Sequence, residues 1–365
     1  MRFGRGRTPV DYLLVVFLQR QLSLISELTS TKLIARGLAP TTAGEIFNHF
    51  GVLLLATRFE FGSRAELWST TPPTKHMPDP EFSSRTGMSR NGFDNLWSNL
   101  FFSRQPAGGP STVGTEQFRR WLVNVFVAAI NKHREDHVTP GDTLCVDESI
   151  SKWYGQGGHW ISVGFLMCVA IDRKPENGCE MQNTACGRSG IMLRLKIVTT
   201  AADHKANLNA AEQGVLHGIA VLWRLVAPWA GSGRIVVSDS YFASVEAVEQ
   251  LAVSGLRFIG VVKTAHRRLP MASLSFRELL TRGDHVSMAH VCTSGRVDMM
   301  AVLRLDRDRR YSVATAGSTQ PGPPCERLQW RETPGGAQRV AVTVPQPEVA
   351  ATFSSCAAKI VQHNR

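Results

Sequence analysis

Hydrophobic positions in the first third of the chain recur at the spacing of an α-helix. Thr42 and Glu45, three residues apart, form the signature of a capping box, and apolar residues follow at intervals of three and four. The same period returns in residues 89–103 and 114–135. We therefore expect residues 1–139 to form a helical region.

The period changes near Pro140, where short apolar runs begin to alternate with turn residues. Three runs predict strands of an antiparallel meander, at residues 143–149, 160–173 and 189–200. The stretches that follow predict a helix at 208–226, a strand at 233–242, a helix at 244–255 and a strand at 256–263. This order predicts an α/β fold with a mixed sheet over residues 140–269. Residues 270–345 read as a β-rich insertion, and a final helix opens near Pro347 within residues 346–365.

The charge of the chain narrows the classes of partner. Its 41 Lys and Arg against 30 Asp and Glu give a net charge of +11, which favours a polyanion such as nucleic acid over a surface kept basic only for solubility. Seven cysteines without a CxxC pair fit a reducing compartment better than a disulfide framework or a zinc ribbon. Asp11 interrupts the N-terminal apolar run, so we expect neither an export signal nor a membrane partner.

Two aspartates carry the candidate chemistry. Asp147 is expected to end the first strand, and Asp239 to end the strand at 233–242. Because those strands lie side by side in a mixed sheet of this order, both carboxylates should meet at one edge, where a divalent cation would offset their repulsion. A pair of such ions about 4 Å apart serves phosphodiester cleavage. In the alternative interpretation, Asp147 caps a turn and Asp239 caps the helix that begins near Ala243.

Several long stretches resemble the transposase domain of the piggyBac superfamily, in the form found in oomycetes and algae. They include GVLLLATRFEFGSRAELW, GMSRNGFDNLW, CVDESISKWYGQGGHW, VAIDRKPENGCEMQNTACGRSGIMLRLK, SDSYFAS and DRDRRYSVATAGS, and the likeness runs from about residue 40 to the end. The resemblance implies an RNase H-like catalytic core, an N-terminal helical region for DNA binding and dimerisation, and an insertion before the final helix. It also implies three aspartates that bind two Mg²⁺ or Mn²⁺ ions.

Two of those aspartates have counterparts here. Asp147 in VDE matches the first and Asp239 in SDSYFAS matches the second, although the family more often has Asn where Ser240 stands. Val361 occupies the position of the third, in KIVQHNR. Glu348 lies more than three helical turns before it, beyond reach of the same site. We therefore expect an incomplete triad and a truncated final helix, without the cysteine-rich finger that some family members carry.

Basic residues follow two of the predicted strands. Lys152 lies in the loop after Asp147, and Lys263, His266, Arg267 and Arg268 crowd together after the strand at 256–263. The family has a comparable basic segment near its DNA. We interpret these five residues as DNA contacts, mainly to phosphates, rather than as a solvated run of charge.

Three functions remain open at this point. The first is a decayed transposase-derived protein that still dimerises and binds DNA. The second is an active cut-and-paste transposase that acts on transposon ends and joins TTAA target DNA. The third is a non-functional remnant with a marginal fold. Ancestry predicts a nuclear location.

Overall fold

The computed structural model describes residues 8, 10, 11, 13, 18–59, 63–71, 80–104, 116–152, 169–170, 177–198, 214–263, 268–290, 298–333 and 336–361. The chain divides into two compact units, Met1–His133 and Arg134–Arg365. None of the helices in these ranges is long and apolar enough to cross a membrane.

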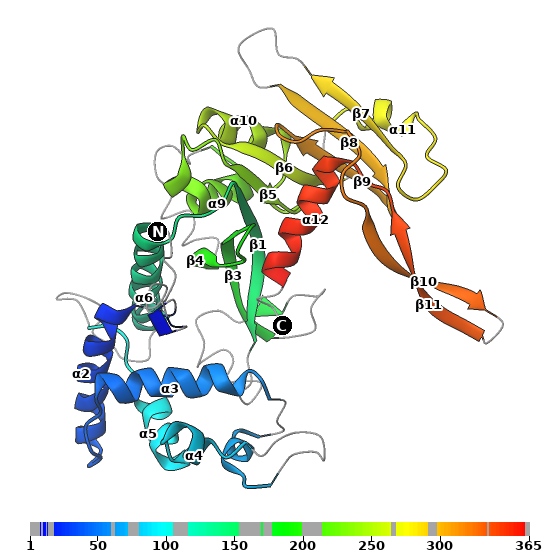
Figure 1. The fold of residues 1–365 in the computed structure, drawn as a ribbon. Coiled ribbons are helices and arrows are strands. Elements are labelled where there is room, and N and C mark those ends of the chain that lie inside the picture. The colour runs from blue at the N-terminus through cyan, green and yellow to red at the C-terminus, as the bar shows by residue number, and fades with distance from the viewer. Residues whose placement is uncertain are drawn as a thin grey trace. The chain divides into compact units, whose positions relative to one another are not determined.

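The first unit is helical, as its hydrophobic period predicts. Its elements are α2 (Gln19–Ala35), α3 (Ala43–Ala56), η1 (Arg64–Trp68), α4 (Phe82–Thr86), α5 (Arg90–Asn99) and the greater part of α6 (Glu116–His137) (Figure 1). The capping box forms: the Thr42 hydroxyl accepts from the Glu45 N–H at 3.2 Å, and the Glu45 carboxylate accepts from the Thr42 N–H at 2.7 Å. Ile46, Phe82 and Phe93 are fully buried in the core of this unit.

The second unit is built on a nine-stranded mixed sheet. Its strands are β1 (Thr143–Lys152), β2 (Val169–Ala170), β3 (Asn177–Cys186), β4 (Met192–Ile197), β5 (Ile235–Ser238), β6 (Arg257–Val262), β7 (His285–His290), β8 (Met299–Leu305) and β9 (Arg309–Ala314). The order is β2-β3-β1-β5-β6-β9-β8-β7, with β4 also paired to β3 (Figure 1). Strands β1, β5 and β6 are parallel, and the other pairings are antiparallel. The predicted α/β class with a mixed sheet is confirmed.

Helices cover both faces of this sheet. Leu144 and Val146 of β1 pack in the cluster that includes α9 (His217–Val226) and α10 (Val245–Val253), while Cys145 packs in the cluster that includes α12 (Glu348–Val361). The alternation follows from the two-residue period of a strand. Two further short helices are η3 (Ala227–Trp229) and α11 (Met271–Ser275).

One strand of the core differs from the sequence prediction. The antiparallel partner of β1 is β3, which lies in a stretch that we predicted to be a turn. Of the predicted strand 160–173, Val169–Ala170 form β2, and the rest lies outside the described residues. The physical reason is that β3 buries polar side chains: Gln182, Asn183 and Thr184 are all at most 1% exposed. Because strand side chains point to the faces of the sheet, this burial comes from elements packed on those faces: α9 and α12 both contact β3, and the Thr184 hydroxyl donates to the Leu225 carbonyl of α9 at 3.0 Å. Hydrophobic periodicity does not detect such a strand.

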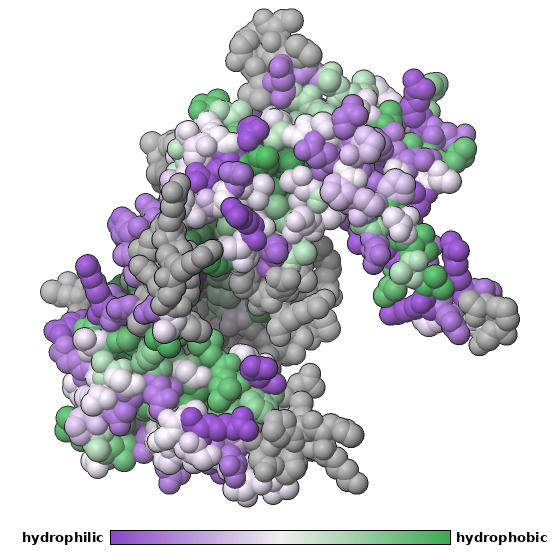
Figure 2. All heavy atoms as spheres, in the orientation of Figure 1, coloured by the Kyte–Doolittle hydropathy of each residue, from purple (hydrophilic) through white to green (hydrophobic). Residues whose placement is uncertain are grey.

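The segment after β6 extends the same sheet and then leaves it. Strand β9 pairs with β6, so β7, β8 and β9 continue the core sheet. Residues 306–308 turn between β8 and β9, which pair as an antiparallel hairpin. A separate two-stranded hairpin, β10 (Cys325–Thr333) and β11 (Gly336–Val344), follows. Figure 2 shows apolar residues among hydrophilic ones along it, where Leu328 and Trp330 are each 66% exposed.

Candidate functional site

The two predicted aspartates lie on neighbouring parallel strands. In the register of β1 and β5, Val146 is opposite Ser238. Asp147 and Asp239 are the residues that directly follow this pair, one after each of the two. Asp239 directly follows β5, as expected. Asp147 does not end its strand, because β1 continues to Lys152. The strand continues there because β3 pairs with it over residues 144–152, and β3 is the strand that the sequence did not predict.

The contacts of Asp239 do not match the alternative interpretation, in which it caps the helix that begins near Ala243. Ser244, not Asp239, is the N-cap of α10, and its hydroxyl accepts from the Ala247 N–H at 3.0 Å. The Asp239 carboxylate instead accepts from the Tyr241 N–H at 2.9 Å and so fixes the turn after β5. This turn leaves the carboxylate at the end of the strand, beside the first aspartate.

A third carboxylate joins the pair. Asp147, Glu148 and Asp239 are half-buried, and each offers one oxygen such that all three oxygens lie within 4.8 Å of one another. The Asp147 carboxylate also accepts from the Glu148 backbone N–H at 2.8 Å. The sequence predicts no role for Glu148, and on an ideal strand a residue next to Asp147 is directed to the opposite face. The only available sequence signal was its adjacency to Asp147.

The negative charge of this acidic cluster shifts the pKa of a nearby tyrosine. Burial raises the pKa of the Tyr241 hydroxyl, and the negative charges of Glu148, Glu180 and Asp239 raise it further. Tyr241 is 42% exposed, so the field extends to a side chain that solvent can reach. The chain as a whole carries a net charge of +11, so this negative potential comes from the side chains of the cluster itself. Such a potential attracts cations.

The residues beside the acidic cluster suit a hard cation. Asn183 lies opposite Asp147 in the β1–β3 register, is fully buried, and donates through Nδ2 to Ser149. Within the described residues, Asn183 Oδ1, Gln182 Oε1 and Ser238 Oγ are buried without a hydrogen-bond partner. Carboxylate and amide oxygens are the donors that Mg²⁺ and Mn²⁺ prefer. The donor chemistry here therefore fits a divalent cation.

The predicted basic residues have different surroundings. Lys152 is the last residue of β1, and Lys263 is exposed directly after β6, the parallel neighbour of β5. Arg268 makes a two-pronged pair with Glu249 of α10, at 2.7 and 3.0 Å, so part of its charge is already neutralised. His266 and Arg267 lie outside the described residues.

The final helix carries no carboxylate near its C-terminal end. Helix α12 runs from Glu348 to Val361, which matches the predicted start near Pro347. The Glu348 carboxylate accepts from the Ser318 hydroxyl at 2.6 Å, and this residue lies about 20 Å along the helix axis from Val361. The valine side chain at position 361 has no atom that can bind a metal ion.

The fold and the sequence both have known counterparts. A model of the family described as "Transposase IS4" matches residues 8–365. Among solved structures, the cryo-EM structure of the piggyBac transposase synaptic complex with hairpin DNA matches with a TM-score of 0.67 at 16% identity, over 98% of this chain and 67% of that one. Its likeness shows that the two chains share a fold. A comparison with curated proteins gave no significant match.

Proposed function

The chain belongs to the transposase IS4 family, with a piggyBac-like transposase domain, and we propose that it is a DNA-binding member with a divalent-cation site whose cleavage activity is lost. The observation that carries the proposal is the acidic cluster Asp147, Glu148 and Asp239, with oxygens within 4.8 Å on neighbouring strands of an RNase H-like core. Such a cluster fits a cation, while Val361 stands where the family's third aspartate is expected.

The two aspartates act together in this proposal. Asp147 and Asp239 would hold the cation from two strands whose register fixes their separation. When bound, Mg²⁺ or Mn²⁺ activates a water molecule and stabilises the leaving oxygen of a phosphodiester. The loss of a carboxylate at position 361 lowers the negative charge of the site, which weakens cation binding and the alignment that in-line attack requires.

The charge of the chain and the solved relative support DNA as the partner. A net charge of +11 favours a polyanion, and the similar solved structure is that of a piggyBac transposase in a synaptic complex with hairpin DNA. We propose that this chain binds DNA through Lys152, Lys263, His266, Arg267 and Arg268, that it does so as a homodimer, and that it acts in the nucleus. Recognition of a TTAA target is part of the same proposal.

A second candidate function is an active nuclease and strand transferase, and one observation favours it. Glu148 brings a third carboxylate within 4.8 Å of the other two, so it can take the place of the acid that is missing from α12. In this version, Glu148 completes the donor set from the same strand as Asp147. The two candidates therefore differ in whether Glu148 restores the chemistry.

A strand-cleavage assay on a labelled duplex containing TTAA, in Mg²⁺ or Mn²⁺, separates these candidates. The variants are Val361→Asp, Asp147→Ala, Glu148→Gln and the double variant Val361→Asp with Asp147→Ala. We expect the native chain to bind the duplex without cutting it, Val361→Asp to cut, and the double variant not to cut. Cutting by the native chain that disappears in Glu148→Gln would overturn the loss of activity and establish the second candidate. Absence of duplex binding would contradict the DNA partner, and binding that does not weaken as salt rises would contradict phosphate contacts through the five basic residues.

A further inference from the structure

A second site of opposite charge lies on the α12 face of the sheet. A pocket of about 230 Å³ is bounded by β6, β8, β9, β10 and α12. Its polar lining consists of Arg304, Asp306, Arg310, Ser312, Arg327 and Ser354, and the rest is apolar. The pocket shares no residue with the acidic cluster Asp147, Glu148 and Asp239. Three guanidinium groups therefore face one carboxylate in a space smaller than the sites that hold drug-sized ligands.

Two of these arginines meet in an unfavourable arrangement. Arg304 of β8 is directly opposite Arg310 of β9 in the antiparallel register. Like charges in that position destabilise a sheet. Arg304 is also buried, with its side chain only 8% exposed, so its charge is poorly screened by water. A pair of this kind needs negative charge nearby.

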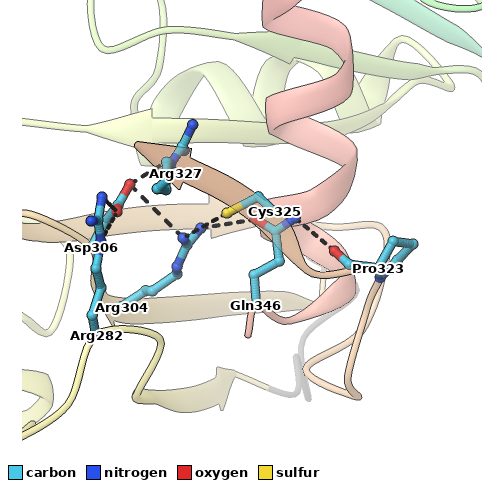
Figure 3. Close-up of polar contacts among 7 residues, drawn as sticks. All are labelled: Arg282, Arg304, Asp306, Pro323, Cys325, Arg327 and Gln346. Carbon is cyan, nitrogen blue, oxygen red and sulfur yellow. Dashed lines mark hydrogen bonds and ion pairs between the residues drawn. The ribbon is translucent and has the colours of Figure 1, made fainter. Parts of the chain in front are cut away.

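The one carboxylate in the pocket is already shared. Asp306 Oδ1 accepts from Arg282 Nε at 2.8 Å and from Arg282 Nη2 at 2.7 Å. Asp306 Oδ2 is 3.4 Å from Arg327 Nη2 and 3.8 Å from Arg304 Nη2 (Figure 3). The short bonds thus go to Arg282, which lies outside the pocket lining, and the two pocket arginines receive the long contacts.

The remaining contacts of Arg304 are weak for a buried cation. Its Nη1 donates to Gln346 Oε1 at 3.1 Å, and its Nη2 contacts the Cys325 sulfur at 3.8 Å (Figure 3). Its Nε is buried and has no hydrogen-bond partner among the described residues. Buried charges are costly unless they are paired, so this guanidinium is incompletely neutralised by the protein.

We propose that this pocket binds a phosphate group. Arg310 and Arg327 are the accessible donors, the Ser312 and Ser354 hydroxyls add neutral hydrogen bonds, and Arg304 supplies positive charge from the pocket wall. Several guanidinium groups around one anion match a phosphate, since each can donate two parallel N–H bonds to its oxygens. The phosphate comes either from a small free phosphate compound or from the backbone of a nucleic acid.

The test uses thermal unfolding of the full chain with inorganic phosphate against sodium chloride of equal ionic strength. The variant is Arg310→Gln, and Arg309→Gln is its matched control. Both arginines are exposed on β9, but Arg309 lies outside the pocket lining because neighbouring strand residues alternate between faces. We expect phosphate to raise the Tm of the native chain and of Arg309→Gln alike. Arg310→Gln should need about tenfold more phosphate for the same rise.

The Tm without phosphate provides a second, independent readout. Removal of Arg310 relieves its repulsion with Arg304, so Arg310→Gln should melt at or above the native Tm in sodium chloride alone. A variant that is as stable as the native chain without phosphate and responds less to phosphate supports the site. Equal phosphate responses in Arg310→Gln and Arg309→Gln, or no response beyond salt in the native chain, would sink the proposal.

Binding of a short DNA duplex at several salt concentrations identifies the source of the phosphate. If the source is a nucleic-acid backbone, Arg310→Gln should reduce the salt slope by about one, and Arg309→Gln should reduce it less. If the source is a free phosphate compound, both variants should lose DNA affinity equally, while only Arg310→Gln loses the response to inorganic phosphate. The effect of phosphate on the Tm is measured independently of the cleavage assay. A negative result in one experiment therefore leaves the other proposal still testable.

Discussion

The second unit holds an acidic cluster with a negative potential and an arginine pocket with a positive potential. Each potential shifts the pKa of one side chain beside it. At the acidic cluster, burial and the charges of Glu148, Glu180 and Asp239 raise the pKa of Tyr241. At the arginine pocket, burial raises the pKa of Asp306, but hydrogen bonds from Arg282 and the charges of its arginine neighbours outweigh burial and leave that pKa lowered. Each field fits a ligand of the other sign.

The difference between the clusters lies in their relation to the whole chain. The acidic cluster opposes a net charge of +11, so attraction of a cation there must come from local side chains. The arginine pocket has the same sign as the rest of the chain, so any polyanion also meets many other basic residues. A cation site can therefore be tested by adding metal alone, whereas a phosphate site needs a matched arginine control.

The largest expected effect is the loss of the shared carboxylate in the arginine pocket. Asp306→Asn leaves Arg282, Arg304 and Arg327 without their common anion, and removal of one partner of a buried ionic network costs about 3 kcal/mol. Urea denaturation should show this drop in the free energy of unfolding. Asp308→Asn, in the same turn but exposed, should change it by no more than about 0.5 kcal/mol. Equal effects from both variants would show that the network is not a stabilising unit.

The acidic cluster should respond to metal by a similar amount. At a Mn²⁺ concentration about a hundredfold above its Kd, the native chain should gain about 2.7 kcal/mol of stability, and Asp147→Asn should gain none. Without metal, Asp147→Asn should be at least as stable as the native chain, because one repulsion is removed. Glu326→Gln, an exposed change on β10, serves as the control and should keep the full metal response.

The stability at acidic pH tests the ionic role of Asp306 in the arginine pocket. Because the folded-state pKa of Asp306 lies below its unfolded value of about 3.9, its contribution is complete above that value and is lost as the pH falls through the folded pKa. Native chain and Asp306→Asn should therefore converge in free energy of unfolding as the pH falls below about 4. A gap between them that stays constant down to pH 2 would contradict the ionic role of Asp306.

The smallest expected effect is on the ionisation of Tyr241. Its absorbance titration, isolated as the difference from Tyr241→Phe, should have a midpoint above the usual tyrosine value of about 10. Glu148→Gln should lower this midpoint, since one of the negative charges that raise it is removed. An unchanged midpoint in Glu148→Gln would place Glu148 outside the field of the acidic cluster.

The sequence by itself determined the features that depend on neighbouring residues. The capping box of α3, the strand–turn–helix around Asp239 and the start of α12 near Pro347 each follow from caps and periods within a few positions. Long motifs also identified the family, which the match over residues 8–365 confirms. The placement of Asp147 beside Asp239 followed from strand order, because parallel neighbours share an edge.

Only the tertiary structure decided which polar residues are buried and which charges share a partner. Strand β3 was not predicted because Gln182, Asn183 and Thr184 are buried by elements packed on the faces of the sheet, α9 and α12 among them, and not through an apolar pattern of their own. Glu148 joined the acidic cluster through local geometry that strand alternation does not predict. The arginine pocket brings together β6, β8, β9, β10 and α12, and Asp306 there is shared by arginines 21 and 24 residues away in the chain. Burial and electrostatic coupling act through space, so a pattern along the chain does not contain them.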